Sequence, residues 1–301
     1  MNRHSVLGAS IAKANNAVES IALSSPCCCI FLRQSMLSLR PTAARLAITA
    51  TILLLLLLFP TRLSFRSANL VASSQRLSRV PSLVLWAWER PERLRFTESQ
   101  KVGVAFLAKT IYLRGDKTVI RPRLQPLDVR DDTPLIAVAR IEIDREEPPT
   151  LSRQQSTNAS REIVVLAHLP QVVAVQVDFD AARSEREFYR RLLFELRQTL
   201  PETTALSMTA LVSWCKGDNW LDQLPVDEAV PMLFRMGVER DRFLSHLSEG
   251  SAFSAKPCRN SMGISTDEPL ALPVASERLY VFNPKPWSAN TITKTMENAR
   301  K

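Results

Sequence analysis

Glycine is scarce in this chain, with seven residues among 301 against nineteen prolines. So few glycines exclude a collagen-like repeat and a glycine-serine linker. Neither of the glycine-rich phosphate-binding patterns, G-x-G-x-x-G and G-x-x-x-x-G-K-[ST], occurs in the sequence. A nucleotide site built on such a loop is therefore not expected.

Histidine is rarer still, with only His4, His168 and His246. His168 lies in a predicted helix just before Pro170, where a structural role is expected. The spacings H-E-x-x-H and C-x-x-C are absent, as is the nucleophile pattern G-x-S-x-G. The sequence therefore predicts no metal site and no cofactor.

The basic excess of the chain is not spread along it. The net charge is +9, but residues 1–66 hold seven basic residues and one acidic residue, which leaves 32 basic and 29 acidic residues in the rest. A nearly balanced domain lacks the electrostatic footprint of a nucleic-acid-binding protein. Nucleic acid is therefore not an expected partner.

No apolar run reaches the length of about 20 residues that a membrane-spanning helix needs. The longest run extends from Leu46 to Phe59 and contains six consecutive leucines. Its length and basic flanks are typical of the hydrophobic region of a signal peptide, and an uncleaved membrane anchor is the alternative. Either reading places the body in the cell envelope, in the periplasm or another extracytoplasmic space. Residues 1–45 form an N-terminal tail, which a start at Met36 would shorten.

The five cysteines fall on both sides of the hydrophobic segment. Cys27, Cys28 and Cys29 precede it, whereas Cys215 and Cys258 lie in the exported body. Because thiols tend to pair in an oxidising compartment, we expect a disulfide between Cys215 and Cys258. Two unpaired thiols are the alternative.

After a polar, Ser/Arg-rich segment at 60–80 that resembles a linker, short β-rich apolar runs recur. Most are continuously apolar, as in parallel strands buried on both faces. A further extended stretch, 117–123, is expected to form a hairpin arm with 110–113. The predicted strands are 83–88, 102–107, 135–141, 172–177, 206–212, 229–234, 262–264 and 279–282.

Helical patterns lie between some of these strands. The clearest is 184–200, with an apolar stripe every four residues and a capping box of Ser184 and Glu187. Others are 161–169, 240–247 and 290–299. Alternating strands and helices over residues 81–301 predict a single (β/α)8 TIM-barrel-like domain, and an open doubly wound sheet is the alternative.

In such folds the functional residues follow the carboxyl ends of the strands. Asp178 and Asp180 end one predicted strand on the same face, so their repulsion should raise one pKa and suit proton transfer. They are the candidate catalytic residues. The alternative is structural, with Asp180 capping the next turn and Asp178 held by an arginine.

Aromatic and polar residues at other strand ends are candidate ligands of a glycan. Aromatic faces suit the apolar C–H faces of sugar rings, although packing in the core is the ordinary role of tryptophan. Arg235 is expected to hold Asp178 or Asp180 ionised or to bind an anionic substrate, and a solvent-exposed arginine is the alternative. The candidate substrate-binding residues are Trp88, Glu89, Trp214, Arg235, Asn283 and Trp287.

Four stretches carry a resemblance to a known family. They are V-Q-V-D-F-D-A (175–181), F-Y-R-R-L-L-F-E-L-R (188–197), S-M-T-A-L-V-S-W-C (207–215) and V-D-E-A-V-P-M-L-F-R-M-G (226–237). They resemble the uncharacterised bacterial domain-of-unknown-function family 3142, which is similar to glycoside-hydrolase TIM barrels. The resemblance implies an exported barrel acting on or binding an envelope polysaccharide.

Chitinase-like barrels carry D-x-D-x-E on the fourth strand, with the glutamate as general acid. Here Asp178 and Asp180 match the first two positions, but the third is Ala182. Either Asp180, Glu89 or Asp227 replaces the missing proton donor, or the protein binds glycan without cutting it. A non-catalytic envelope binding or assembly protein is the rival function.

Overall fold

The computed structural model describes residues 71–98, 101–237, 240–241, 245, 253–268 and 276–298. The N-terminal tail and the hydrophobic segment 46–59 lie outside these residues, as does most of the predicted helix 240–247. Among the residues described, no helix is both long and apolar enough to span a bilayer.

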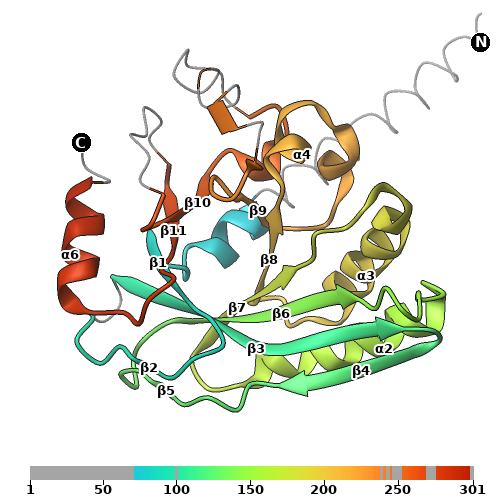
Figure 1. Ribbon diagram of the computed structural model, residues 1–301, viewed down its shortest axis with the longest axis horizontal. Coiled ribbons are helices and arrows are strands. Elements are labelled where there is room, and N and C mark those ends of the chain that lie inside the picture. Colours follow the sequence, from blue (N-terminus) through green and yellow to red (C-terminus); the bar gives the residue numbers. More distant parts are fainter. Residues whose placement is uncertain are drawn as a thin grey trace, which may run out of the picture. The chain divides into compact units, whose positions relative to one another are not determined.

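Eight parallel strands form a nearly closed barrel, in the order β10-β11-β1-β3-β6-β7-β8-β9 (Figure 1). A parallel bridge from Met232 to Gly263 brings the two ends of this order together, and the Leu233 amide donates to the Gly263 carbonyl at 2.7 Å. The predicted α/β barrel is confirmed at this level, and each predicted strand is present. The strands are β1 (Leu83–Ala87), β3 (Val102–Arg114), β6 (Leu135–Ile143), β7 (Val172–Asp178), β8 (Ala205–Ala210), β9 (Glu228–Pro231), β10 (Ser261–Ser265) and β11 (Arg278–Phe282).

Three further strands lie outside the order of the barrel strands. β4 (Lys117–Pro122) pairs antiparallel with the second half of β3, as the predicted hairpin requires, and Gly115 turns the chain with a positive φ of 51°. β2 (Glu92–Arg93) pairs with β5 (Leu127–Asp128). The described parts of the connections from β1 to β3 and from β3 to β6 therefore hold strands where a regular (β/α)8 barrel has helices.

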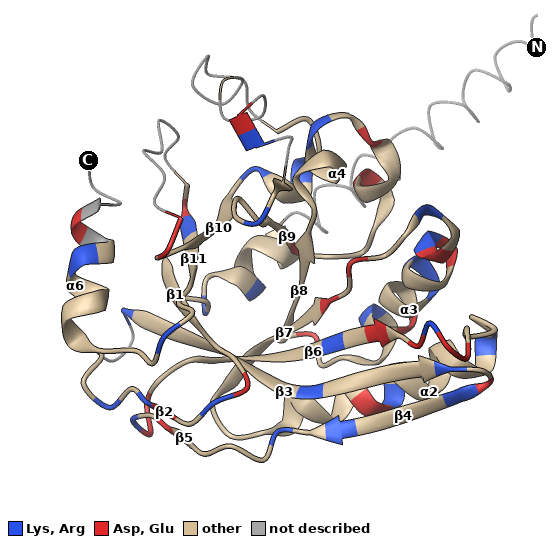
Figure 2. Cartoon of the chain, in the orientation of Figure 1, with Lys and Arg blue, Asp and Glu red and all other residues tan. Residues whose placement is uncertain are grey.

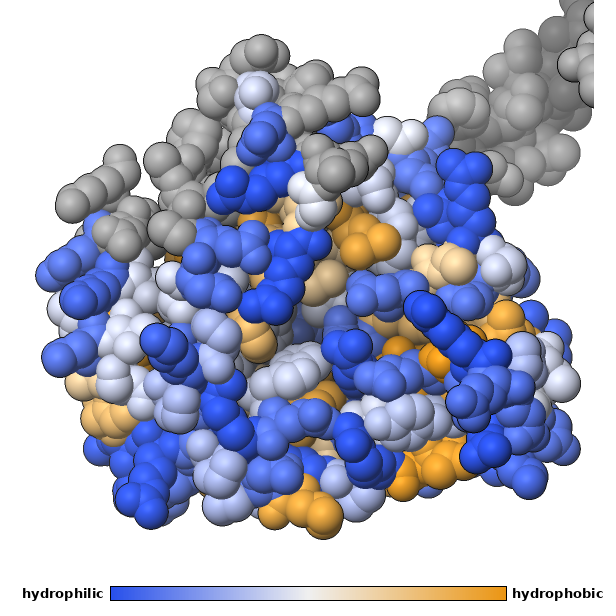
Figure 3. Space-filling model, viewed as in Figure 1, coloured by the Kyte–Doolittle hydropathy of each residue, from blue (hydrophilic) through white to orange (hydrophobic). Residues whose placement is uncertain are grey.

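Helices cover the outside of the ring, with α2 and α3 side by side and α6 on another side (Figure 1). On the face seen in Figure 3, hydrophobic residues surface in separate groups among hydrophilic ones. The helices are α2 (Arg153–Val164), α3 (Arg186–Thr199), α4 (Val212–Gly217) and α6 (Ala289–Asn298), with the 3-10 helices η1 (Val165–His168), η2 (Arg183–Glu185), η3 (Asn219–Gln223) and η5 (Lys256–Cys258).

α3 buries the apolar stripe that its sequence predicts, including Phe188, Leu192 and Leu196. The predicted capping box is wrong. Glu185 takes that role, because its carboxylate accepts from the Ala182 amide at 2.7 Å. The 3-10 helix η2 precedes α3 and already includes Ser184, so Ser184 is not the residue at which helical structure begins.

Part of the segment 60–80, which resembles a linker in composition, is ordered against the barrel. Residues 71–77 are helical, and Arg76 pairs with Asp227 at 2.7 Å. Arg278, at the start of β11, donates to the carbonyls of Leu77 and Pro81 and pairs with buried Glu228 at 2.8 Å. Arg76 of this Ser/Arg-rich segment is therefore paired with the barrel instead of being free in solvent. We call residues 77–81 with Glu228 and Arg278 the plug, since they fill the amino end of the barrel.

The barrel interior is filled by side chains above the plug. The Trp86 indole donates to Gln176 at 3.0 Å, and Gln176 donates to Ser207 at 3.0 Å. Gly263 makes room for Trp86, because a Cβ there would lie 2.8 Å from the Trp86 ring. We call the opposite end of the barrel, at the carboxyl ends of the strands, the mouth. Trp86 forms its floor.

Candidate functional site

The mouth holds a cavity of about 700 Å³. Its lining comes from the carboxyl ends of several strands and the segments just after them, which is where α/β barrels place their functional groups. The lining is both aromatic and charged. It consists of Trp86, Trp88, Arg140, Asp178, Asp180, Thr209, Leu211, Val212, Ser213, Lys216, Gly217, Met232, Phe234, Arg235, Met236 and Phe282.

Asp178, the last residue of β7, is only 6% exposed. The Thr209 hydroxyl donates to it at 2.7 Å and the Arg140 guanidinium at 3.2 Å. Burial raises the pKa of Asp178 above its ordinary value, while these two donors act in the opposite direction. The nearby Asp180 charge is a lesser cause, so burial more than repulsion produces the predicted shift.

Arg140, on β6, is clamped between two carboxylates and an aromatic ring. It pairs with Glu142 at 2.7 Å and with Asp178 at 3.2 Å. Its guanidinium carbon lies 5.7 Å from the centre of the Trp88 ring, within the range of a cation–π contact. Asp178 therefore holds the arginine that supports one face of Trp88. This agrees with the alternative in which Asp178 has a structural role and is held by an arginine.

Asp180 is in a different situation. It is exposed in the mouth, and within the described chain it makes no hydrogen bond or ion pair. The predicted alternative, in which it caps the next turn, is not seen because Glu185 does so. Of the two aspartates, Asp180 is the one available to a ligand.

Aromatic side chains form one wall of the cavity. Phe234 and Phe282 are stacked with centroids 5.7 Å apart, and Phe234 meets the edge of Trp86 at 6.1 Å. Trp88, Phe234 and Phe282 are half-buried, so they keep surface free for a ligand. The candidate set missed Trp86, Arg140, Phe234 and Phe282. The alternation of side chains along a strand could have identified three of them. Trp86 lies on the same face of its strand as Trp88. In the same way, Arg140 shares a face with Val138, and Phe282 shares one with Tyr280.

Trp214 does not line the cavity. It is buried, with its ring edge-on to Trp220 at 5.0 Å. The reason is that α4 begins at Val212, so the side chains now follow a helical period. Ser213, Lys216 and Gly217 face the cavity instead.

Three further candidates also lie elsewhere. Trp287 is buried, and its indole donates to the Trp86 carbonyl at 3.0 Å. Asn283 is buried, accepting from Thr266 at 2.6 Å. Glu89 pairs with Arg121 beside a separate cavity of about 200 Å³. None of the three is among the residues that line the mouth.

Asp227 is excluded as a replacement proton donor. It precedes β9 at the amino end of the barrel, where Arg76 and Arg197 bind its carboxylate. This is the end opposite the mouth, so the side chain has no access to a ligand there.

Arg235 lines the mouth but pairs with Asp267 at 3.2 Å rather than with Asp178 or Asp180. Its backbone has a positive φ of 55°, and its guanidinium carbon lies 5.7 Å from the Phe282 ring centre. The role of holding Asp178 belongs to Arg140 instead.

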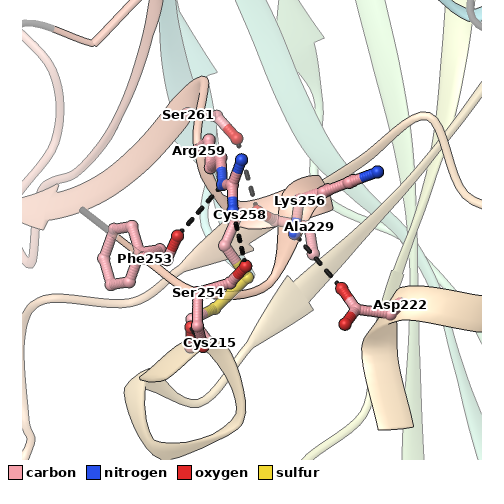
Figure 4. The surroundings of a disulfide bond; sticks show 9 residues. All are labelled: Cys215, Asp222, Ala229, Phe253, Ser254, Lys256, Cys258, Arg259 and Ser261. Atoms are coloured by element: carbon pink, nitrogen blue, oxygen red, sulfur yellow. Dashed lines mark hydrogen bonds between the residues drawn. A yellow bond between two sulfur atoms is a disulfide. The ribbon is translucent and has the colours of Figure 1, made fainter. Parts of the chain in front are cut away.

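Cys215 and Cys258 form a disulfide with Cα atoms 5.9 Å apart (Figure 4). The segment around Cys258 folds back so that the Ser254 hydroxyl and the Ala255 amide donate to the Cys215 carbonyl. The bond joins α4, which contributes to the cavity lining, to the segment ahead of β10. Among the described residues, no group of three His, Cys, Asp or Glu side chains is placed to hold a metal ion.

No family model matches this chain, and no curated protein matches it. Among solved structures, the spore cortex-lytic enzyme SleL of Bacillus cereus aligns with a TM-score of 0.39 and 16% sequence identity. The alignment covers 62% of this chain and 51% of that chain, so the match spans about half the length of that protein.

Proposed function

We propose that this chain is a glycoside-hydrolase-like barrel that binds a polysaccharide of the cell envelope at its mouth, and that it belongs to the family it resembles, domain-of-unknown-function family 3142. The observation that carries the proposal is the lining of the cavity. Half-buried aromatic side chains there lie beside an open carboxylate, Asp180. Aromatic faces stack on the C–H faces of sugar rings, and carboxylates accept hydrogen bonds from sugar hydroxyls.

Binding without cutting is the form of this function that the geometry favours. Hydrolysis by two carboxylates needs them on either side of one bond, roughly 5–5.5 Å or 6.5–9.5 Å apart. In the described lining the carboxylates are Asp178 and Asp180, both at the end of β7. Asp178 is committed to Arg140 and Thr209, which leaves Asp180 alone.

The proposed place of action is the cell envelope, outside the cytoplasm. The hydrophobic segment 46–59 supports export, as a cleaved signal or as an inner-membrane anchor. The Cys215–Cys258 disulfide supports an oxidising compartment.

The test is a screen of envelope polysaccharides for binding and for release of reducing ends, with the full chain in mild detergent. We expect binding by the wild type without release, and Trp88→Ala should weaken it about tenfold by removing a stacking surface. Phe96→Ala is the matched control, because Phe96 is an exposed aromatic residue outside the cavity lining.

Two results would contradict the proposal. Absence of binding to every polysaccharide would remove the function altogether. Release of reducing ends that Asp180→Asn abolishes would replace binding with hydrolysis.

A further inference from the structure

The lining of the mouth is divided between a polar side and an apolar side. Figure 2 shows charged residues of both signs on β6, whereas β8 carries none. The polar side lies on β6 and β7 and at the adjoining part of β8, and consists of Arg140, Asp178, Asp180 and Thr209. The apolar side follows β8, β9 and β11, further round the barrel, and consists of Leu211, Val212, Met232, Phe234, Met236 and Phe282.

Three polar side chains also lie on the apolar side, namely Ser213, Lys216 and Arg235. Arg235 is turned to the rim, where its guanidinium pairs with Asp267. Ser213 and Lys216 are exposed on α4, next to Leu211 and Val212 in the chain. The apolar side is therefore bordered by polar groups, and a ligand held there needs an apolar part of limited size.

Only part of the aromatic surface is open for stacking on a sugar. The Arg140 guanidinium carbon lies 5.7 Å from the centre of the Trp88 ring, over one face. Phe282 lies parallel to Phe234 with centroids 5.7 Å apart, and Arg235 is also close to the Phe282 ring. Because neighbours already use these faces, the other face of Trp88 is the main platform for a sugar ring.

The rest of the apolar side is aliphatic. Leu211 is 37% exposed, and Met232 and Met236 are half-buried. Aliphatic side chains present no flat face to a sugar, and sugar hydroxyls placed against them would lose hydrogen bonds to water. A hydrocarbon chain suits this surface, because its burial is favourable and methionine adapts its shape to what it packs on.

We propose that the mouth binds a sugar that carries an apolar chain, an alkyl or acyl substituent. The sugar ring stacks on Trp88 and its hydroxyls donate to Asp180. The chain packs on Leu211, Met232 and Met236. This inference rests on the proposed glycan-binding function and names the substrate class of the same site.

The experiment compares methyl, butyl and hexyl β-D-glucopyranosides, which differ only in chain length, with n-hexanol, which lacks the sugar. The full chain is held in an amphipathic polymer, so that no free detergent competes for the mouth, and calorimetric titration gives the dissociation constants. A methylene that leaves water completely tightens binding about fourfold, so in a cavity open at one end the hexyl glucoside should bind about tenfold more tightly than the methyl glucoside. Hexanol should bind about tenfold more weakly than the hexyl glucoside, because it lacks the stacking and hydrogen bonds of the sugar.

Leu211→Asn removes apolar surface from the mouth at nearly unchanged side-chain size. It should reduce the advantage of the hexyl over the methyl glucoside about threefold. Leu169→Asn is the matched control, because Leu169 is 41% exposed and lies outside the cavity lining. It should keep the full advantage.

The outcomes separate this inference from the function on which it rests. Equal affinity for the three glucosides overturns the apolar-chain inference and leaves glycan binding standing. An advantage that Leu211→Asn leaves intact overturns it too, since the chain would then pack elsewhere. Hexanol that binds as tightly as the hexyl glucoside counts against both proposals, because the sugar would contribute nothing. If no probe binds, the inference fails, and the polysaccharide screen decides whether glycan binding survives.

Discussion

At the scale of single residues, Asp178 and Asp180 have different environments although they are two positions apart. Asp178 is buried and bound by Thr209 and Arg140, whereas Asp180 is exposed in the mouth. The sequence placed both on one face of a strand but could not show which would find a partner. That partner, Arg140, comes from the neighbouring strand, so its identity depends on strand order and register.

The raised pKa of Asp178 makes stability depend on pH in a specific direction. Because the folded chain binds this proton more readily than the unfolded chain, stability is lost as pH rises from the ordinary aspartate value of about 3.9 through the raised value. Asp178→Asn lacks this titration. In urea unfolding, the stability of the wild type relative to Asp178→Asn should therefore fall across that window and then level off.

Thr209→Val tests the cause of the same effect. The Thr209 hydroxyl lowers the pKa of Asp178, so its removal should extend the window to higher pH. A difference between wild type and Asp178→Asn that does not change with pH, or that grows as pH rises, would refute this account of Asp178.

At the scale of elements, the strands were predictable and the segments between them were less so. Continuous apolar runs mark strands buried on both faces, which is why each predicted strand is present. α4 begins directly after β8, so side chains there follow a helical period and not the alternation of a strand. The sequence therefore predicts Trp214 at the mouth, although it packs in the core. The helical segment 71–77 was missed because its stabilising partners, Asp227 and Arg278, lie far along the chain.

The disulfide between α4 and the segment before β10 should contribute strongly to stability. It closes a loop with a sequence separation of 43 residues, so the chain-entropy model assigns it about 4 kcal/mol. The double variant Cys215→Ala, Cys258→Ala should lose an amount of this order in urea unfolding.

Reduction supplies the control for this prediction. A thiol reductant should lower the stability of the wild type toward that of the double variant and leave the variant unchanged. Equal stability of wild type and double variant, or two reactive thiols in the folded protein, would show that the bond does not form or does not matter.

At the scale of the whole described domain, the barrel has one filled end and one open end. The plug of residues 77–81, Glu228 and Arg278 fills the amino end, and the mouth, lined by aromatic and charged side chains, is the other. The sequence predicted the barrel and the end at which a site would lie, because strand direction determines that end. It predicted fewer of the lining residues, since inward-facing side chains depend on barrel closure and on how the loops turn.

The most direct test of the central claim uses fluorine-labelled tryptophan. The five indoles are divided by the structure, with Trp86 and Trp88 lining the mouth and Trp214, Trp220 and Trp287 packed elsewhere. Single Trp→Phe variants assign the five ¹⁹F resonances, and a glycan that binds the full chain is then titrated. The account predicts that the resonances of Trp86 and Trp88 shift on binding while the other three stay in place. Shifts confined to Trp214, Trp220 or Trp287 would contradict a ligand site at the mouth.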